Sequence, residues 1–362
     1  GIYNGYNSNP MLTNVTFSDN LATILCGGMH NSGNSPILIN VVFSGNSATE
    51  SGGGMCNYSS SPTLTNVTFN NNTAEYNNGG GMYNTDSNPT LTNVTFSDNV
   101  ANKGGGMYNN FSSSPLLTNI TFSGNFANSG GGMYNNGSNP TLTNVTFNNN
   151  LAPDYGWGGG MVNDFSSPTL MNVTFYNNSA PSGGGMGNYS SSPTLTNVVF
   201  SNNSAAVWGG GIYNVSNSRP TIRNTIFWGN TASSDGEQIY DNASFPSVSD
   251  SVVQGGYTGG TNIITADPLL GSLGDYGGFT QTVSLLQGSS AIDTGNNAYC
   301  PATDQRGIPR PQGAGCDIGT FEYMIPPAAF EKLGPTDAEV DTSLSPMLSW
   351  QPSSGATSYE YC

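Results

Sequence analysis

Three acidic residues lie close enough along the chain to share a cation: Asp235, Glu237 and Asp241 fall within seven residues. Carboxylate oxygens are the ligands that Ca²⁺ prefers in proteins, so these three are candidate calcium ligands. The alternative, which we favour, is that Asp235 and Glu237 are solvated loop acids and that Asp241 ends a repeating pattern. The sequence indicates no other metal and no cofactor.

Chemistry on a polysaccharide needs a pair of carboxylates, or a carboxylate with a basic residue, on one surface. The only histidine is His30, and the first 230 residues contain three basic residues. The acids of this part fall mostly at different positions of the repeat: Asp19, Glu50, Glu75, Asp86, Asp98, Asp154 and Asp164. We therefore expect no enzymatic activity. The alternative is a polysaccharide lyase or hydrolase with its site near Asp154–Trp157.

The cysteines indicate a secreted protein. Cys300 and Cys316 bracket a loop rich in Pro and Gly, and we expect them to form a disulfide, which requires an oxidising compartment. Cys26 and Cys56 fall in neighbouring repeats but four positions out of register. We expect their Cα atoms to lie more than about 7 Å apart, which is too far for a bond.

The charge of the chain excludes several partners. Its net charge is −16, with six Lys and Arg in all, so it cannot neutralise a phosphate backbone or bind an anionic membrane. No run of about 20 apolar residues occurs, so we expect no membrane insertion. Gly1 already stands inside a repeat, and we expect that an N-terminal part has been removed or is missing.

The elements that position these residues follow a repeat of about 26 residues. A Pro begins the pattern P-T-L-T-N-V-T-F, which is clearest at Pro62–Phe69 and Pro140–Phe147, and a G-G-G-M segment recurs in most repeats. Apolar and polar residues alternate within the pattern and slip by one residue at the Asn. A turn of the chain at that Asn explains the slip, because Asn tolerates the left-handed conformation.

Asparagine recurs at three positions of every repeat. The post-Pro asparagines follow the Pro by four residues: Asn14, Asn40, Asn66, Asn93, Asn119, Asn144, Asn172, Asn197 and Asn224. The post-Phe asparagines follow the Phe by three residues: Asn20, Asn46, Asn72, Asn99, Asn125, Asn150, Asn178, Asn203 and Asn230. The post-Gly asparagines follow the G-G-G-M segment: Asn4, Asn31, Asn57, Asn84, Asn109, Asn135, Asn163, Asn188 and Asn214.

These columns predict an all-β fold, a triangular right-handed parallel β-helix of about ten turns over residues 1–256. An Asn side chain both donates and accepts, so stacked asparagines can form ladders at the corners. Met, Leu, Val and Phe columns fill the interior. In the tenth repeat Asp241 and Asp250 replace Asn. An ionised Asp cannot donate, so we expect the ladders and the coil to end there.

The paired motifs G-G-G-M and F-x-x-N, as in Gly79–Met82 and Phe96–Asn99, resemble the repeats of the polymorphic outer-membrane protein family. Its members are bacterial surface proteins with β-helical regions used in adhesion. The resemblance covers residues 1–256. It departs from the family in having Met or Ile after three glycines, where the family has G-G-A-I.

Residues 257–323 resemble the C-terminal region of choice-of-anchor proteins of type Q. The resemblance rests on Asp267–Leu270, Gly277–Thr280, Gly288–Asp293, Asp304–Gly307 and Cys316–Glu322. It implies a secreted or surface-attached protein, and we expect a β-rich cap or tail here. Residues 324–328 are the predicted linker. Residues 329–362 resemble the first strands of a fibronectin type III module, with Ser345–Trp350 as the clearest match.

Two further surface features have alternative interpretations. A column of Tyr residues, including Tyr83 and Tyr108, could stack on sugars or on a partner, but stacking between the tyrosines themselves is the simpler interpretation. Several N-x-[ST] sequons occur. We expect Asn66, Asn93 and Asn144 to be inaccessible within a ladder, which leaves Asn71 and Asn110 as glycosylation candidates. These two sites apply only in a host that glycosylates its proteins.

The sequence therefore favours an extracellular structural protein at the cell surface. We expect a subunit of a filament, sheath or adhesive layer, with the chain itself as the partner in a head-to-tail homopolymer, because β-helices expose unpaired strand edges at their ends. The alternative is a monomeric surface adhesin that binds glycans or other cell-surface components.

Overall fold

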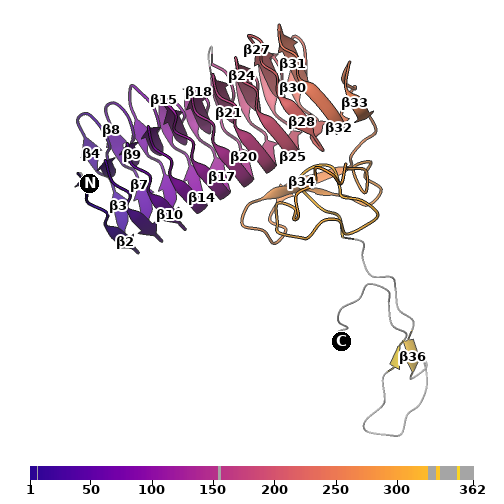
Figure 1. Ribbon diagram of the computed structural model, residues 1–362, viewed down its shortest axis with the longest axis horizontal. Helices are drawn as coiled ribbons and strands as arrows, with labels where there is room; N and C mark the ends of the chain where they lie inside the picture. The colour runs from indigo at the N-terminus through magenta and orange to yellow at the C-terminus, as the bar shows by residue number, and fades with distance from the viewer. Residues whose placement is uncertain (6, 154–155, 325–331, 335–348, 351–362) are drawn as a thin grey trace. The chain divides into compact units, whose positions relative to one another are not determined.

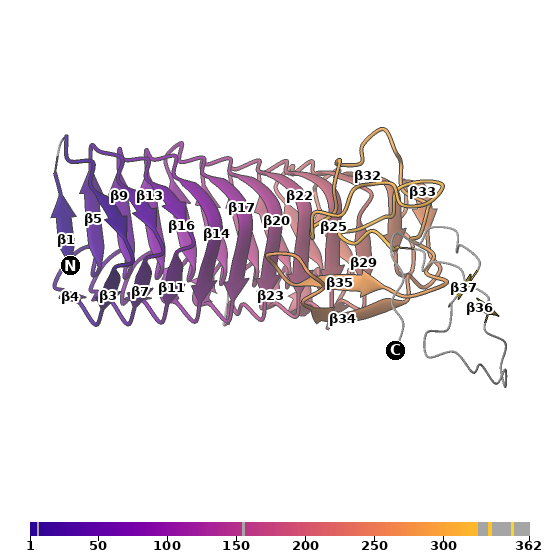
Figure 2. The same cartoon turned by 90° about the horizontal axis from the view of Figure 1, so that it is seen from below.

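The chain folds into a long parallel β-helix with a smaller lobe along one side (Figures 1 and 2). The computed structural model describes residues 1–5, 7–153, 156–324, 332–334 and 349–350. The chain divides into two units, Gly1–Tyr323 and Met324–Cys362. No helix occurs among the described residues, and accordingly none of them forms a helix that could span a membrane.

Parallel strands form the three walls of the coil, and the third wall is divided into a five-stranded and a three-stranded sheet. The first sheet has ten strands, one per turn, which confirms about ten turns. Its strands are β1 (Ile2–Asn4), β5 (Met29–Ser32), β9 (Met55–Tyr58), β13 (Met82–Thr85), β16 (Met107–Asn110), β19 (Met133–Asn136), β21 (Met161–Asp164), β24 (Met186–Tyr189), β27 (Ile212–Val215) and β31 (Ile239–Asn242). Turns are numbered below by these strands, so turn one contains β1 and turn ten contains β31.

The second sheet holds the P-T-L-T-N-V-T-F segments, which bend at the post-Pro Asn. Before the bend lie β2 (Met11–Thr13), β6 (Ile37–Ile39), β10 (Thr63–Thr65) and β28 (Thr221–Arg223), and after it lie β3 (Thr16–Ser18), β7 (Val42–Ser44), β11 (Thr68–Asn70) and β29 (Ile226–Trp228). Single strands span the bend in the other turns: β14 (Thr90–Ser97), β17 (Leu116–Ser123), β20 (Thr141–Asn148), β22 (Thr169–Tyr176), β25 (Thr194–Ser201) and β32 (Ser247–Val253). A last strand, β33 (Thr261–Ile264), pairs with β32.

The third wall consists of short strands that follow the post-Phe Asn. They are β4 (Leu21–Ala22), β8 (Ser47–Ala48), β12 (Thr73–Ala74), β15 (Val100–Lys103), β18 (Phe126–Ser129), β23 (Ser179–Ser182), β26 (Ser204–Trp208) and β30 (Thr231–Ala232). In the second unit, β36 (Lys332–Gly334) pairs antiparallel with β37 (Ser349–Trp350). Most of the predicted fibronectin-like segment, 329–362, lies outside the described residues.

The interior consists of continuous columns of identical side chains. Phe rings stack from Phe17 to Phe227 with centroids 4.6–4.9 Å apart and planes within 7° of parallel. The Met, Leu and Val columns beside them are almost fully buried. The glycines that precede Met allow this close approach. A Cβ on Gly81 would lie 2.6 Å from the Gly106 carbonyl oxygen and 2.8 Å from the Phe96 ring.

The structure confirms three asparagine ladders, and it shows that they do not all run the same way. In the post-Gly ladder each Nδ2 donates to Oδ1 of the next turn, as Asn84 does to Asn109 at 2.9 Å. The post-Phe ladder runs in the same direction. In the post-Pro ladder Nδ2 donates to the preceding turn, as Asn66 does to Asn40 at 3.1 Å, except at Asn197, where Nδ2 donates to Asp317 and Gly319 instead. The post-Pro asparagines have positive φ, 54° at Asn66, which explains the bend at this position.

The direction of each ladder decides how it ends. Asp241 accepts from Asn214 at 2.8 Å and ends the post-Gly ladder, as expected. In the post-Pro ladder the later turn is the donor, so Asp250 can accept: Asn262 donates to its Oδ1 at 2.8 Å. Asp250 does not donate to Asn224, so the ladder between turns ends there as expected, and one further strand, β33, pairs with β32 beyond the tenth turn.

Residues 265–323, called the C-terminal lobe, lie along the side of the coil (Figure 2) and contact turns six to ten. The lobe contains the antiparallel pair β34 (Leu270–Gly274) and β35 (Thr282–Leu285). Asn172 donates to the carbonyl oxygen of Thr303, and Asn197 donates to those of Asp317 and Gly319. The region expected to cap the coil therefore covers one flank of it, and only the segment around 254–264 lies over the end.

Candidate functional site

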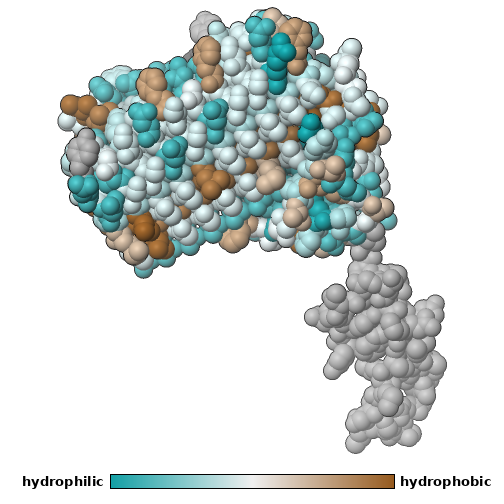
Figure 3. All heavy atoms as spheres, in the orientation of Figure 1, coloured by the Kyte–Doolittle hydropathy of each residue, from teal (hydrophilic) through white to brown (hydrophobic). Residues whose placement is uncertain are grey.

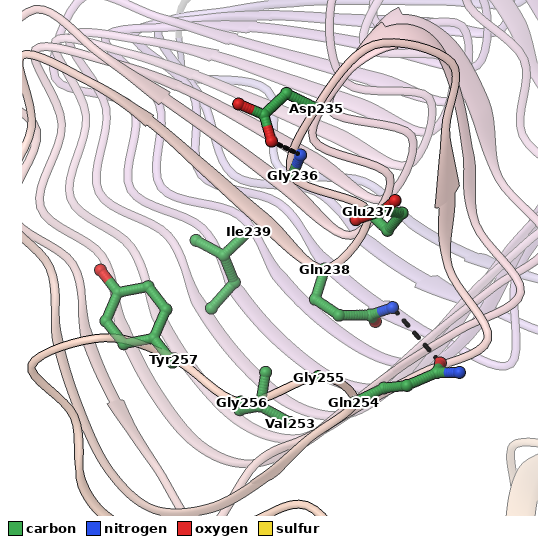
Figure 4. Close-up of a pocket in the computed structure, with 10 residues that line it drawn as sticks. All are labelled: Asp235, Gly236, Glu237, Gln238, Ile239, Val253, Gln254, Gly255, Gly256 and Tyr257. Atoms are coloured by element: carbon green, nitrogen blue, oxygen red, sulfur yellow. Dashed lines mark hydrogen bonds between the residues drawn. The ribbon is translucent and has the colours of Figure 1, made fainter.

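The end of the coil contains a hollow of about 180 Å³, lined by Asp235–Ile239 and Val253–Tyr257 (Figure 4). Asp235 accepts a hydrogen bond from the backbone N–H of Gly236 at 2.8 Å. Glu237 lines the same hollow, but Asp241 does not. No group of three potential metal ligands occurs among the described residues. The structure thus places two of the proposed calcium ligands together and separates the third.

Asp241 is occupied by contacts within the protein. Its Oδ1 accepts from Asn214, and its Oδ2 accepts the hydroxyl hydrogen of Tyr257 at 2.7 Å. Burial raises the pKa of Asp241, and burial beside this carboxylate raises the pKa of Tyr257. A buried carboxylate with both oxygens paired suits the end of a ladder better than a cation site.

The tyrosine column on the first sheet forms a stack. The rings of Tyr83 and Tyr108 lie 5.6 Å apart and 3° from parallel, and Tyr134 continues the stack at 5.4 Å. Tyr108 and Tyr134 are buried. Sugars bind to the faces of aromatic rings, and in these turns each face is already covered by the next ring. The stacking interpretation is therefore the better one here.

Three ionisable side chains beside this stack contact one another in series, which the sequence did not predict. The Lys103 ammonium is 4.7 Å from the centre of the Tyr134 ring and 3.4 Å from its hydroxyl. That hydroxyl donates to Oδ2 of Asp164 at 2.9 Å. Burial and the Asp164 charge raise the pKa of Tyr134. The three residues fall at different repeat positions, which hides their proximity in the sequence.

The long loop of turn six returns to the coil. Residues 154–155, and with them Asp154 of the alternative enzyme site, lie outside the described residues. The loop ends at Trp157, whose indole stacks on Tyr189 with centroids 6.0 Å apart. Gly187 interrupts the tyrosine column at this height, and a Cβ there would lie 3.2 Å from the Cβ of Trp157. Trp157 therefore occupies the space that the missing side chain leaves.

The structure contains two disulfides. Cys300 and Cys316 are joined with their Cα atoms 6.6 Å apart. Cys26 and Cys56 are also joined, with Cα atoms 5.4 Å apart, so the prediction that they are too distant is wrong. Cys26 has φ of 62° at the position that is Gly52 one turn later. The chain reverses sharply there, so residues four positions apart lie next to each other.

The sequon asparagines differ in exposure from what the ladders predict. Asn71 is exposed, as a glycosylation site requires. Asn110 is 8% exposed, and its Oδ1 accepts from Asn136 at 2.8 Å, so it is not an accessible acceptor. Asn66 is exposed although it belongs to a ladder, because nothing in the described residues covers the post-Pro corner in turns one to three. Asn93 and Asn144 are half-buried.

The C-terminal lobe binds the coil through Gln305. Its Nε2 donates to Thr146 at 2.8 Å, and its Oε1 accepts from Thr174 at 2.8 Å. Apolar contacts flank these bonds, because Val199 and Ile226 replace the outward Thr of other turns and pack against Ile318 of the lobe. These two replacements were a signal in the sequence that this strip of the coil is covered.

Buried ion pairs hold the lobe together. Arg306 bonds Asp304 at 2.6 Å, and Arg310 lies 3.4 Å from Glu322. Burial raises the pKa of the nearby Asp317 to about 6. Its carboxylate accepts from the backbone N–H groups of Asp293 and Tyr323. Arg310 also donates to the carbonyl oxygens of Asp317 and Gly319, and only its buried Nε is without a partner.

Comparisons with known proteins support the fold. The model of the right-handed β-helix region matches residues 40–187, and the repeat of Chlamydia polymorphic membrane proteins matches residues 197–215. The second match includes the F-x-x-N motif of β25 and the G-G-G-I segment before β27. Searches of the curated proteins and of the solved structures give no significant match.

Proposed function

We propose that this protein is a non-enzymatic, extracellular β-helical rod of the adhesin kind, displayed at a cell surface. The observation that carries the proposal is the match of residues 197–215 to the polymorphic membrane protein repeat. In this chain the two motifs of that repeat have defined roles. F-x-x-N supplies a core Phe and a ladder Asn, and G-G-G-I forms the tight corner before the next strand.

An extracellular location agrees with the two disulfides and with the polar surface, since the face of the coil in Figure 3 is mostly white and teal. Disulfides form and persist in oxidising compartments. Charged residues make up only 8% of the chain, and ladders and aromatic stacks supply the contacts between turns. The resemblance of residues 257–323 to choice-of-anchor proteins also favours surface attachment.

The rod is proposed to act as a separate unit and not as a segment of a head-to-tail filament. Continuing the coil would require another chain to stack on turn ten. Tyr257 and Ile263 pack against the exposed end of the core, and β33 covers the last strand of the second sheet. The hydroxyl of Tyr257 also occupies the free oxygen of Asp241. A head-to-tail filament is the alternative, and it would require these residues to be displaced.

A glycan-degrading enzyme is the second alternative, and the Lys103–Tyr134–Asp164 chain is its best described candidate. Proton transfer by a Tyr requires a pKa lowered toward neutral pH. Here burial and a carboxylate raise the pKa of Tyr134, so the hydroxyl stays protonated as a donor to Asp164. Assays of the full chain on acidic and neutral polysaccharides should show no turnover. Turnover lost in Asp164→Asn or Asp154→Asn would contradict the non-enzymatic proposal.

Protease treatment of intact native cells tests surface display. The protein should be removed from the cells by external protease, while an intracellular marker stays intact. Electron microscopy of the purified chain should show dispersed rods. Protection from protease would refute display, and axially continuous fibres would favour the filament.

A further inference from the structure

The second sheet carries an uncovered apolar patch at turns one and two that departs from the repeat. Most turns place Thr at the outward positions of this sheet. Turn two has Ile37, Ile39 and Val42 instead, and Met11 pairs in register with Ile37. Met11 is 65% exposed, Ile37 39% and Val42 36%. These four residues are called the apolar patch.

The same kind of departure occurs on this sheet in turns eight and nine, and there it marks a covered surface. Val199 and Ile226 replace outward Thr residues in turns eight and nine, and the C-terminal lobe buries both. The apolar patch lies on the same sheet, but the lobe contacts the coil only from turn six onward, beginning at Asn144 and Thr146. Nothing among the described residues covers the patch.

The outward face of the second sheet in turns one to five is called the strip. Its composition favours a second copy of this chain as the partner. The strands on it from β2 to β17 contain no Asp, Glu, Lys, Arg or His, although the chain has a net charge of −16. Two exposed acids, Asp19 and Asp98, follow β3 and β14 at the edge of the strip, but its face is uncharged, so a second copy can approach that face with little repulsion. The patch has no aromatic ring for a sugar and no cation for an anionic lipid.

A further exposed residue makes the strip self-complementary. Leu116 in turn five is 46% exposed and continues the outward column of Met11 and Ile37 through Thr63 and Thr90. Met11 and Leu116 are four turns apart. In an antiparallel pair of coils related by a two-fold axis at turn three, each Met11 faces the Leu116 of the other copy, and the patches lie toward opposite ends.

We propose that two copies of this chain pair side by side and antiparallel through the second sheet of turns one to five, with the apolar patch and Leu116 at the interface. A two-fold axis makes the contact isologous, so the pair closes and does not grow. This inference goes beyond surface display and does not depend on it.

Sedimentation velocity of the full chain tests the pairing. The wild type should form a dimer, and the variant I37T/I39T/V42T should dissociate at least tenfold more readily. Because these substitutions restore the residue that most turns carry, the fold should be unchanged. The matched control is Val100→Thr, since Val100 is 39% exposed on β15 of the third sheet and pairs with Thr73. A monomeric wild type, or a dimer that the triple variant leaves unchanged, would overturn the proposal.

Cross-linking tests the orientation. In a C362S background, M11C/L116C should give a covalent dimer with a bismaleimide about 10 Å long, which spans the distance between two sheets packed face to face. M11C alone should not, because the two Met11 residues would be about 19 Å apart along the coil axis, or four strand spacings, in addition to the distance between the sheets. A cross-linked M11C dimer would overturn the antiparallel arrangement, as would a non-covalent dimer of M11C/L116C that fails to cross-link.

Discussion

The hydroxyl of Tyr257 donates to Oδ2 of Asp241 at 2.7 Å, on the carboxylate whose Oδ1 already accepts from Asn214. Asp241 thus accepts from the last Asn of the post-Gly ladder, which has nine members, and from Tyr257, which covers the end of the core. The contact lies where an eleventh turn of the first sheet would otherwise begin, and it explains why an Asp stands at this place in the repeat.

Replacing Tyr257 with Phe should destabilise the end of the coil. The change keeps the ring over the core and removes only the hydrogen bond to the carboxylate, which is worth about 1.5–3 kcal/mol for a charged acceptor. Urea unfolding should show a loss in this range. Asp241→Asn is the matched variant and should cost less, because an Asn can still accept from Asn214. Equal stability of Tyr257→Phe and the wild type would show that the contact contributes nothing.

Buried and exposed ladder positions should differ in their cost. Asn109 is fully buried, and Asn109→Ala leaves an Asn84 amide hydrogen and the Asn135 Oδ1 unpaired. At roughly 1–3 kcal/mol for each buried group, the loss should be about 2–6 kcal/mol. Asn66→Gly removes an exposed rung and suits the positive φ, so it should cost less than about 1 kcal/mol. Comparable losses in the two variants would contradict the importance of burial.

Reduction of the Cys26–Cys56 bond should weaken the N-terminal turns. A cross-link over a separation of 30 residues typically contributes about 2–4 kcal/mol. The double variant C26G/C56Y restores the residues that other turns carry, so it should fold. In this variant the reductant should no longer change the rate of amide hydrogen exchange in turns one to three. Amide hydrogen exchange in turns one to three provides the measurement. Unchanged exchange of the wild type after confirmed reduction would contradict this prediction.

The stability of the C-terminal lobe should depend on the protonation of Asp317. Burial raises its pKa from 3.8 to about 6, so the folded lobe binds this proton more tightly than the unfolded chain. Stability should therefore fall as the pH rises from about 4 to about 6, and then stay level with respect to this group. Asp317→Asn should flatten this part of the pH profile while losing a backbone hydrogen bond. A profile equally steep in the variant would assign the dependence to other groups.

The repeat predicted most of the coil, because periodic columns leave little choice of register. A shift of one residue would turn the Phe and Leu columns outward, and it would break the asparagine ladders. The Pro, Asn, Phe and Gly columns of the repeat therefore determine the turns, the bend and the corners.

Details that depend on the path of the chain between columns were not predictable in this way. Cys26 and Cys56 are out of register along the chain, yet a tight reversal brings them together. The direction of the post-Pro ladder, which lets Asp250 accept from Asn262, depends on side-chain orientation at a left-handed residue. The lobe contact was marked by Val199 and Ile226, but only the structure shows which segment covers them.

The Cys26–Cys56 disulfide and the C-terminal lobe each restrain some turns of the coil, so the coil does not extend evenly under a tensile load. Hydrogen bonds between turns run along the axis, so a pull on the N-terminal side opens them one turn at a time. Each turn of about 26 residues then lengthens from about 4.8 Å to roughly 90 Å. After residues 1–25 have come off the coil, the Cys26–Cys56 disulfide transmits the force directly. The residues between the two cysteines, which form turn two, therefore do not extend. The lobe holds turns six to ten from the side. Beyond residues 1–25, turns three to five, which neither the disulfide nor the lobe restrains, are the part of the rod that extends under load.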